Sequence, residues 1–300
     1  MGGPKHNEEA LDPELFMAMD DLELVARGVV EGALSGVHRS KFVGFSNEFD
    51  SHRQYMPGDD LKHVNWNLWG KTDRLYVKQY ESDTNLNLYL VVDTSKSMIA
   101  ENGPHSKWAY AKRASAAMAY LATKLRDTPG LCMLCGKEPV FVEPKARSGH
   151  FFEILATLES KTPETSLSIY ELLDENRSFC SRPGIVILFS DLFDQDKELL
   201  DTLETYTMMG HEVIIFQILD DWEKNLPEDE EMIFHDLETG EKLKVNTSHI
   251  REKYEREVRK WAKNFKEESA GKGIDFISVS TSDPLADILT VYLNKRCAVF

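Results

Sequence analysis

Short apolar runs and segments with helical periodicity alternate along most of the chain. Apolar runs of strand length, such as 86–93 and 185–190, are followed by segments whose apolar residues recur at helical spacing. This alternation is typical of a mainly parallel sheet that is covered by helices on both faces. The predicted fold class is therefore α/β, with a doubly wound, mainly parallel sheet.

The same patterns predict where the elements and the parts of the chain lie. Strands are predicted at 86–93, 185–190, 211–219 and 275–279, with a hairpin-like pair at 131–142 and an exposed hairpin at 232–246. Helices are predicted at 13–34, 106–126, 149–160, 167–180, 195–209, 248–269 and 284–295. Between 37 and 82 the sequence changes to short β-like runs and tight turns. We therefore expect a smaller, irregular N-terminal β/helix region at 1–83 and the α/β domain at 84–300.

The first strong apolar run leads into a pattern that suits a divalent cation. Residue Asp93 ends the run, and Ser95 and Ser97 follow at alternate positions. Because the chain must turn after the strand, these three side chains can point into one shared space. A carboxylate and two hydroxyls are hard oxygen ligands of the kind that Mg²⁺ accepts. With only one charged ligand, the ion would keep most of its charge and attract an outside carboxylate, as an adhesion site does.

A second apolar strand ends in another acid. The run 184–191 closes with Ser190 and Asp191. Ligands of doubly wound sheets bind beyond the carboxyl ends of the strands, so we expect Asp191 to lie close to Asp93. Ser or Asp after a strand also commonly caps the following helix, and for both acids the capping role stays open beside the metal role.

The Asp-x-Ser-x-Ser pattern resembles the metal-ion-dependent adhesion site of von Willebrand factor A domains. That family also supplies a threonine from a second loop and an aspartate from a third loop. The resemblance implies Asp93, Ser95, Ser97, Thr165 and Asp191 as the metal-binding set, with Mg²⁺, or Mn²⁺ or Ca²⁺, as the ion. Pro163 and Glu164 stand where the family usually has glycines.

A second signature precedes the first strand. It contains the series Glu48-Phe49, Arg53-Gln54-Tyr55, Pro57-Gly58-Asp59-Asp60 and Asn65-Trp66, followed by 71–78. This series resembles the bacterial family named "domain of unknown function 58", in which it stands before a von Willebrand factor A-like domain. The family usually has an acid where this chain has Asn65. The resemblance implies a protein partner, a MoxR-type AAA+ ATPase. As a structural alternative, the block is a packing network in which Arg53 and Arg74 pair with Glu48, Asp59 or Asp60.

Composition narrows the class of partner and the compartment. The chain of 300 residues carries a formal net charge of −16, which argues against a nucleic-acid or anionic-membrane surface. No apolar run is long enough to span a bilayer, and the polar first ten residues lack the apolar centre of a signal peptide. The 4 cysteines suit a reducing compartment, and Cys132 and Cys135 are expected to be core thiols. We therefore expect a cytoplasmic protein.

Catalytic motifs are incomplete in this sequence. Gly70-Lys71-Thr72 looks like the end of a phosphate-binding loop, but Asn65 stands where that loop needs its first glycine. Ser95 stands where a phosphatase of the haloacid dehalogenase type needs a second carboxylate. The sequence thus favours a non-catalytic interaction module that binds an acidic residue of a partner through Mg²⁺. The alternatives are a structural scaffold with an empty site, and a divalent-metal-dependent hydrolase.

Overall fold

The structure is a computed structural model. It describes residues 21–37, 51–55, 68–70, 74–79, 86–99, 106–135, 138–161, 169–192, 197–226, 231–235 and 242–299. The chain divides into two compact units, one formed by Met1–Gly36 with Leu86–Phe300 and the other by Val37–Asn85.

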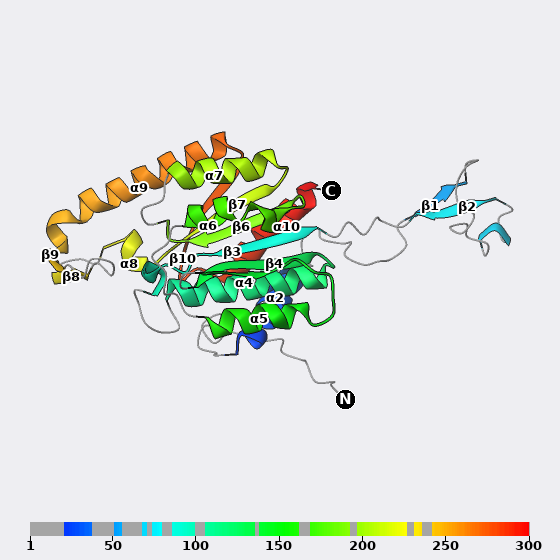
Figure 1. Cartoon of the computed structure of the whole chain (residues 1–300), viewed down its shortest axis with the longest axis horizontal. Helices are drawn as coiled ribbons and strands as arrows, with labels where there is room; N and C mark the ends of the chain where they lie inside the picture. Colours follow the sequence, from blue (N-terminus) through cyan, green and yellow to red (C-terminus); the bar gives the residue numbers. More distant parts are fainter. Residues whose placement is uncertain are drawn as a thin grey trace, which may run out of the picture. The chain divides into compact units, whose positions relative to one another are not determined.

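The larger unit is built on a six-stranded sheet with the order β10-β7-β6-β3-β4-β5 (Figure 1). Its strands are β3 (Asn87–Val92), β4 (Thr128–Cys135), β5 (Glu138–Val142), β6 (Gly184–Ser190), β7 (Glu212–Leu219) and β10 (Ile274–Ser280). All neighbouring strands are parallel except the edge pair of β4 and β5. The predicted doubly wound, mainly parallel α/β fold is confirmed.

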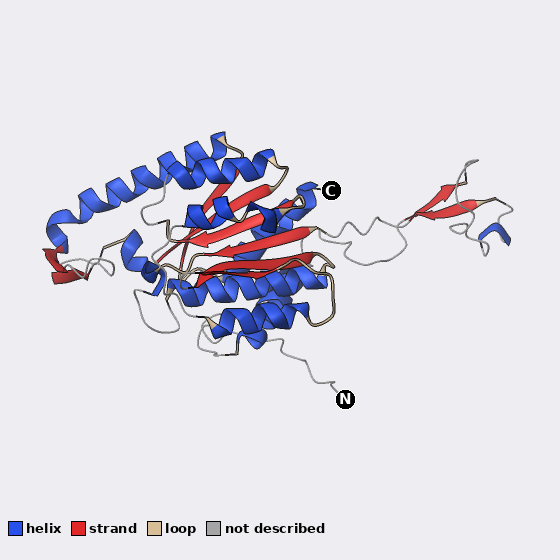
Figure 2. Ribbon diagram, in the orientation of Figure 1, coloured by secondary structure: helices blue, strands red, loops and turns tan. Residues whose placement is uncertain are grey.

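Helices cover both faces of this sheet (Figure 2). One face carries α4 (Lys107–Lys124) and α10 (Leu285–Val299), together with α2 (Leu22–Val37) and α5 (His150–Ser160). The other face carries α6 (Ile169–Glu175), α7 (Lys197–Met208) and α9 (Thr247–Gly271). No helix among the described residues has the length and apolar character needed to cross a membrane.

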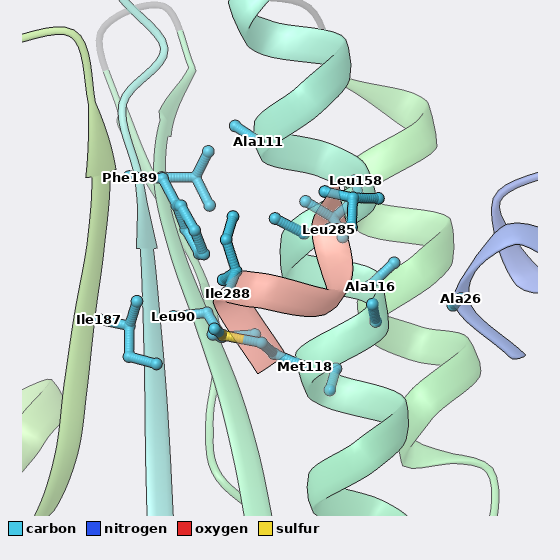
Figure 3. Packing of buried hydrophobic residues seen from close by; sticks show 14 of the residues in the cluster. Ala26, Leu90, Ala111, Ala116, Met118, Leu158, Ile187, Phe189, Leu285 and Ile288 are labelled. Carbon is cyan, nitrogen blue, oxygen red and sulfur yellow. The ribbon is translucent and has the colours of Figure 1, made fainter. Parts of the chain in front are cut away.

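Successive residues of the central strands belong to two separate hydrophobic cores, one on each face of the sheet. Leu90 and Phe189 belong to the core on the α4 side, where Met118 of α4 and Ile288 of α10 pack (Figure 3). Val91, one position along β3, belongs to the core on the α7 side. Both faces of these central strands are buried, which explains the continuous apolar runs at 88–92 and 185–189.

The winding of the chain reverses between β3 and β6. Helix α4 connects β3 to β4 across one face, whereas α7 connects β6 to β7 across the other face. Neighbouring strands whose connections leave in opposite directions form a crevice beyond their carboxyl ends. The ends of β3 and β6 are therefore the place where this topology favours a ligand.

The N-terminal helix belongs to the larger unit rather than to the region 1–83 in which we expected it. Val25, Ala26 and Val30 are fully buried in the α4-side core. Arg27 lies over the ring of Tyr120 on α4, 5.9 Å from its centroid. The apolar stripe of α2 is thus buried against α4. The smaller unit ends at Asn85, and the larger unit resumes at Leu86.

Small elements complete the two units. The smaller unit contains the antiparallel pair β1 (Ser51–Gln54) and β2 (Tyr76–Gln79). In the larger unit, β8 (Glu231–His235) and β9 (Lys242–Asn246) pair antiparallel, as predicted for the hairpin at 232–246. Helix α8 (Asp221–Lys224) and the 3₁₀ turns η2 (Lys96–Ile99) and η3 (Arg177–Cys180) are also present. Glu48, Asp59, Asp60 and Asn65 lie outside the described residues, so the pairing proposed for Arg53 and Arg74 stays a prediction.

Candidate functional site

The ends of β3 and β6 bring the two predicted acids together. Val92 pairs with Phe189 in the sheet, and the backbone N–H of Asp93 donates to the carbonyl oxygen of Phe189 at 2.9 Å. Asp93 therefore lies beside Ser190, whose hydroxyl donates to its Oδ2 at 2.5 Å. Asp93 and Asp191 are both buried, at 5% and 3% exposure. The carboxyl ends of β3 and β6 therefore lie side by side, with Asp93 and Asp191 directly after them.

The chain after Asp93 folds back on the carboxylate. The backbone N–H of Ser95 donates to Asp93 Oδ1 at 2.8 Å. The hydroxyls of Ser95 and Ser97 then form a hydrogen bond with each other, with their oxygens 2.9 Å apart. We call Asp93, Ser95 and Ser97 the 93–97 turn, since the carboxylate holds the segment that presents the two hydroxyls.

Burial and a neighbouring acid make the charge on Asp93 costly. The pKa of Asp93 is raised to about 6, first by burial and then by the negative charge of Asp191. Hydrogen bonds from Ser190 and Ser95 offset part of this rise because they favour the ionised carboxylate. A cation bound nearby would relieve the repulsion between the two acids.

A buried lysine stands at this site, and the sequence interpretation missed it. Lys107 Nζ lies 2.8 Å from Asp191 Oδ2 and 2.8 Å from Glu223 Oε1. The side chains of Lys107 and Asp191 are each only 2% exposed. Burial by itself would lower the pKa of Lys107, but the two carboxylates outweigh it and raise the pKa above its ordinary value. The site therefore contains a permanent internal cation.

Glu223 is held in place by contacts of its own. It is the third residue of α8 and forms a capping box with Asp220, whose backbone N–H donates to Glu223 Oε2 at 2.8 Å. The hydroxyl of Tyr254 on α9 donates to the backbone oxygen of Glu223 at 2.9 Å. An acid after β7 followed by Glu223 is a recognisable capping signal, but that signal does not reveal the contact with Lys107.

The residue after Asp191 adopts an unusual backbone conformation. Leu192 has a φ of 60°, in the left-handed region that a branched side chain rarely enters. Its side chain is buried in the α7-side core, and its N–H donates to Ser190 Oγ at 3.0 Å. Strain of this kind costs about 1–3 kcal/mol and is concentrated at functional sites.

The family follows from comparison with known sequences. The sequence model of the family described as "Protein of unknown function DUF58" matches residues 51–264. The chain belongs to this family. The match includes the signature block from residue 51 onward and the strand ends that carry Asp93 and Asp191, and it confirms the family that the sequence indicated.

A mycobacterial protein is similar to this chain over most of its length, and solved structures are similar to it at lower identity. "Uncharacterized protein Rv1480" of Mycobacterium tuberculosis is 25% identical over 293 residues, which cover 95% of this chain and 91% of that protein. The conserved hypothetical protein BatB from Bacteroides thetaiotaomicron is 17% identical, with 71% of this chain and 99% of that chain covered and a TM-score of 0.48. The VWA domain of SpRpn10 is 10% identical, with 68% and 93% covered and a TM-score of 0.42. The fold itself is shown by the strand order of the sheet.

The donors of this DUF58 family member suit a small divalent cation at the 93–97 turn. Neighbouring ligands of an octahedral Mg²⁺ lie roughly 3 Å apart, and the hydroxyl oxygens of Ser95 and Ser97 are 2.9 Å apart. In the described part of the chain, no group of three or more His, Cys, Asp or Glu side chains is arranged to hold a metal. A cation here would therefore depend on the serine hydroxyls and Asp93. Thr165 lies outside the described residues.

Proposed function

We propose that this protein is a non-catalytic interaction module that binds an acidic side chain of a partner protein through a Mg²⁺ ion. The observation that carries the proposal is the pair of hydroxyls of Ser95 and Ser97, 2.9 Å apart, beside the buried Asp93. This group stands where the winding of the sheet reverses, which is where doubly wound folds bind ligands.

Each residue of the site has a distinct part in this proposal. Ser95 and Ser97 bind the ion directly, and Asp93 holds the turn and supplies negative charge. Asp191 contributes from the neighbouring strand end, and Thr165 is assigned to the set by the resemblance to von Willebrand factor A domains. A bound Mg²⁺, or Mn²⁺ or Ca²⁺ in its place, would supply positive charge and a binding position for a carboxylate of the partner.

The candidate partner comes from the family resemblance. A MoxR-type AAA+ ATPase is the first protein to test, and the contact would use one of its exposed Asp or Glu side chains. An acidic ligand fits this site, because a divalent ion that is bound directly by one carboxylate keeps a net positive charge.

A structural scaffold is the second candidate, and a specific contact favours it. The ion pair of Lys107 with Asp191 already supplies a positive charge at the strand ends. In that case Asp93 and Ser190 serve only to join β3 to β6. A divalent-metal-dependent hydrolase is the third candidate, and turnover of phosphoesters that is lost in Asp191→Ala would favour it.

Calorimetric titration with Mg²⁺ and Mn²⁺ tests the proposal. We expect saturable binding by the wild type, and loss of binding in Asp93→Ala and in the double variant Ser95→Ala/Ser97→Ala. The double variant is the sharper test because it keeps the carboxylate of Asp93. Ser282→Ala is a matched control, since Ser282 lies after β10 and its hydroxyl donates to Asp221 at 2.9 Å, outside the 93–97 turn. Absence of saturable binding, or equal binding by the double variant, would reject the metal site.

A pull-down then tests the partner. The wild type with Mg²⁺ should retain the MoxR-type ATPase, whereas chelation of the metal or Ser95→Ala should release it. Retention that is insensitive to both changes would show that the contact does not pass through this site.

A further inference from the structure

Lys107 is buried at a position where local physical chemistry disfavours a lysine. It is the first residue of α4, directly after the cap residue Ser106, and its side chain is 2% exposed. The N-terminus of a helix carries partial positive charge, which repels a cation. Burial of an ammonium group is costly as well unless the group is paired. Lys107 is thus unfavourable both for its place in the helix and for its burial, and it lies beyond the carboxyl ends of the strands. Such a residue is a candidate for a functional role.

The two partners of Lys107 fix its ammonium group in one place. Nζ lies 2.8 Å from Asp191 on β6 and 2.8 Å from Glu223 on α8. Glu223 is itself held by the backbone of Asp220 and by the hydroxyl of Tyr254. Because Glu223 is anchored independently, the ammonium stays beside Asp191, which follows the strand next to that of Asp93.

We propose that Lys107 limits the negative charge of this site by holding Asp191 and Glu223 in ion pairs, so that Asp191 acts on a cation at the 93–97 turn only through water. The inference rests on the proposed function and adds a residue that determines its specificity. Without the ammonium, the carboxylates of Asp93, Asp191 and Glu223 would more than neutralise a doubly charged ion. The site would then carry a net negative charge and repel a further acid from a partner.

Lys107 therefore acts in opposite directions on the two ligands. Its positive charge weakens the binding of a divalent cation, because like charges repel. The same charge strengthens the capture of a partner carboxylate by the bound cation. A purely structural ion cluster would instead contribute to stability alone, and its loss would leave the affinity of the turn for cations unchanged.

Titration of the full chain with Mn²⁺ separates these roles. We expect Lys107→Met to bind Mn²⁺ about tenfold more tightly than the wild type, or tighter still, since the carboxylate of Asp191 then loses the cation that balances its charge. Lys107→Arg keeps the charge and should bind as the wild type does. Equal or weaker binding by folded Lys107→Met would overturn the inference.

A second pair of variants keeps the test decisive if Lys107→Met is too unstable to titrate. Loss of Lys107 alone leaves the carboxylates of Asp191 and Glu223 without their charged partner. In Lys107→Met/Glu223→Gln, only the carboxylate of Asp191 is left without it. The double variant should bind Mn²⁺ about tenfold more tightly than Glu223→Gln, and equal affinities would overturn the role of Lys107. No saturable binding by the wild type would reject the proposed function itself, whereas wild-type binding without tightening in either comparison would reject only the role of Lys107.

Discussion

The hydroxyl of Ser190 donates a hydrogen bond of 2.5 Å to Asp93, a residue 97 positions earlier in the chain. This contact joins the ends of β3 and β6 at the reversal of the winding. The same oxygen accepts the N–H of Leu192 at 3.0 Å, so one side chain ties the two strand ends to the strained turn after Asp191. Ser190 was not among the predicted site residues, yet it sets the geometry in which they meet.

Replacement of Ser190 should therefore cost more than a typical serine substitution. Ser190→Ala removes a buried donor to Asp93 and a buried acceptor for Leu192, and we expect a loss of about 1–3 kcal/mol in the free energy of unfolding. Urea denaturation measures this loss. Ser160→Ala, at an exposed serine of α5, is the control and should change stability by less than about 0.5 kcal/mol. Equal effects of the two substitutions would show that the hydrogen bonds of Ser190 with Asp93 and Leu192 do not stabilise the fold.

A buried ion pair ties the last helix to the sheet. Asp127, whose side chain is fully buried, accepts bonds from Arg296 Nε at 2.6 Å and from the hydroxyl of Tyr292 at 2.8 Å. Arg296→Met leaves the carboxylate without its charged partner, so we expect a loss of about 3–5 kcal/mol. Arg177→Met breaks the exposed pair with Asp174 and should cost about 0–1 kcal/mol. Denaturation midpoints of both variants check this contrast, and similar shifts would contradict it.

Stability should fall in mild acid partly because of His211. Burial lowers the pKa of His211 below its ordinary 6.5, and its Nε2 lies 2.9 Å from the carbonyl oxygen of Cys180. The folded protein keeps the ring neutral while the unfolded chain takes up a proton, so the stabilisation is present above pH 6.5 and is lost as the pH falls below it. Denaturation at pH 7.5 and pH 5.5 should give a smaller difference for His211→Gln than for the wild type. An unchanged difference would show that another group is responsible.

The fold and part of the site could be predicted because they depend on local patterns. Asp93 and Asp191 each follow an apolar run that is buried on both faces, and parallel strands bring such ends to one edge of the sheet. Ser95 and Ser97 follow Asp93 at fixed spacing, so their proximity is a local property as well. Thr165 lies outside the described residues, and its place in the site stays a prediction.

Lys107 could not be predicted in the same way. Its partner Asp191 lies 84 positions away, and a lysine at the start of a helical pattern is indistinguishable from an exposed one. The docking of α2 was missed for a similar reason. An amphipathic helix shows that it buries one face, but its pattern does not show which surface it packs against.

The location of a bound cation is the most direct test of the account. Crystals of the full chain grown with Mn²⁺ would be measured at a wavelength where manganese scatters anomalously. The account predicts an anomalous peak at roughly 2.1 Å from the hydroxyl oxygens of Ser95 and Ser97, beside Asp93 and close to Asp191. Well-ordered 93–97 turns with no peak there, at a Mn²⁺ concentration that saturates the protein in solution, would contradict it.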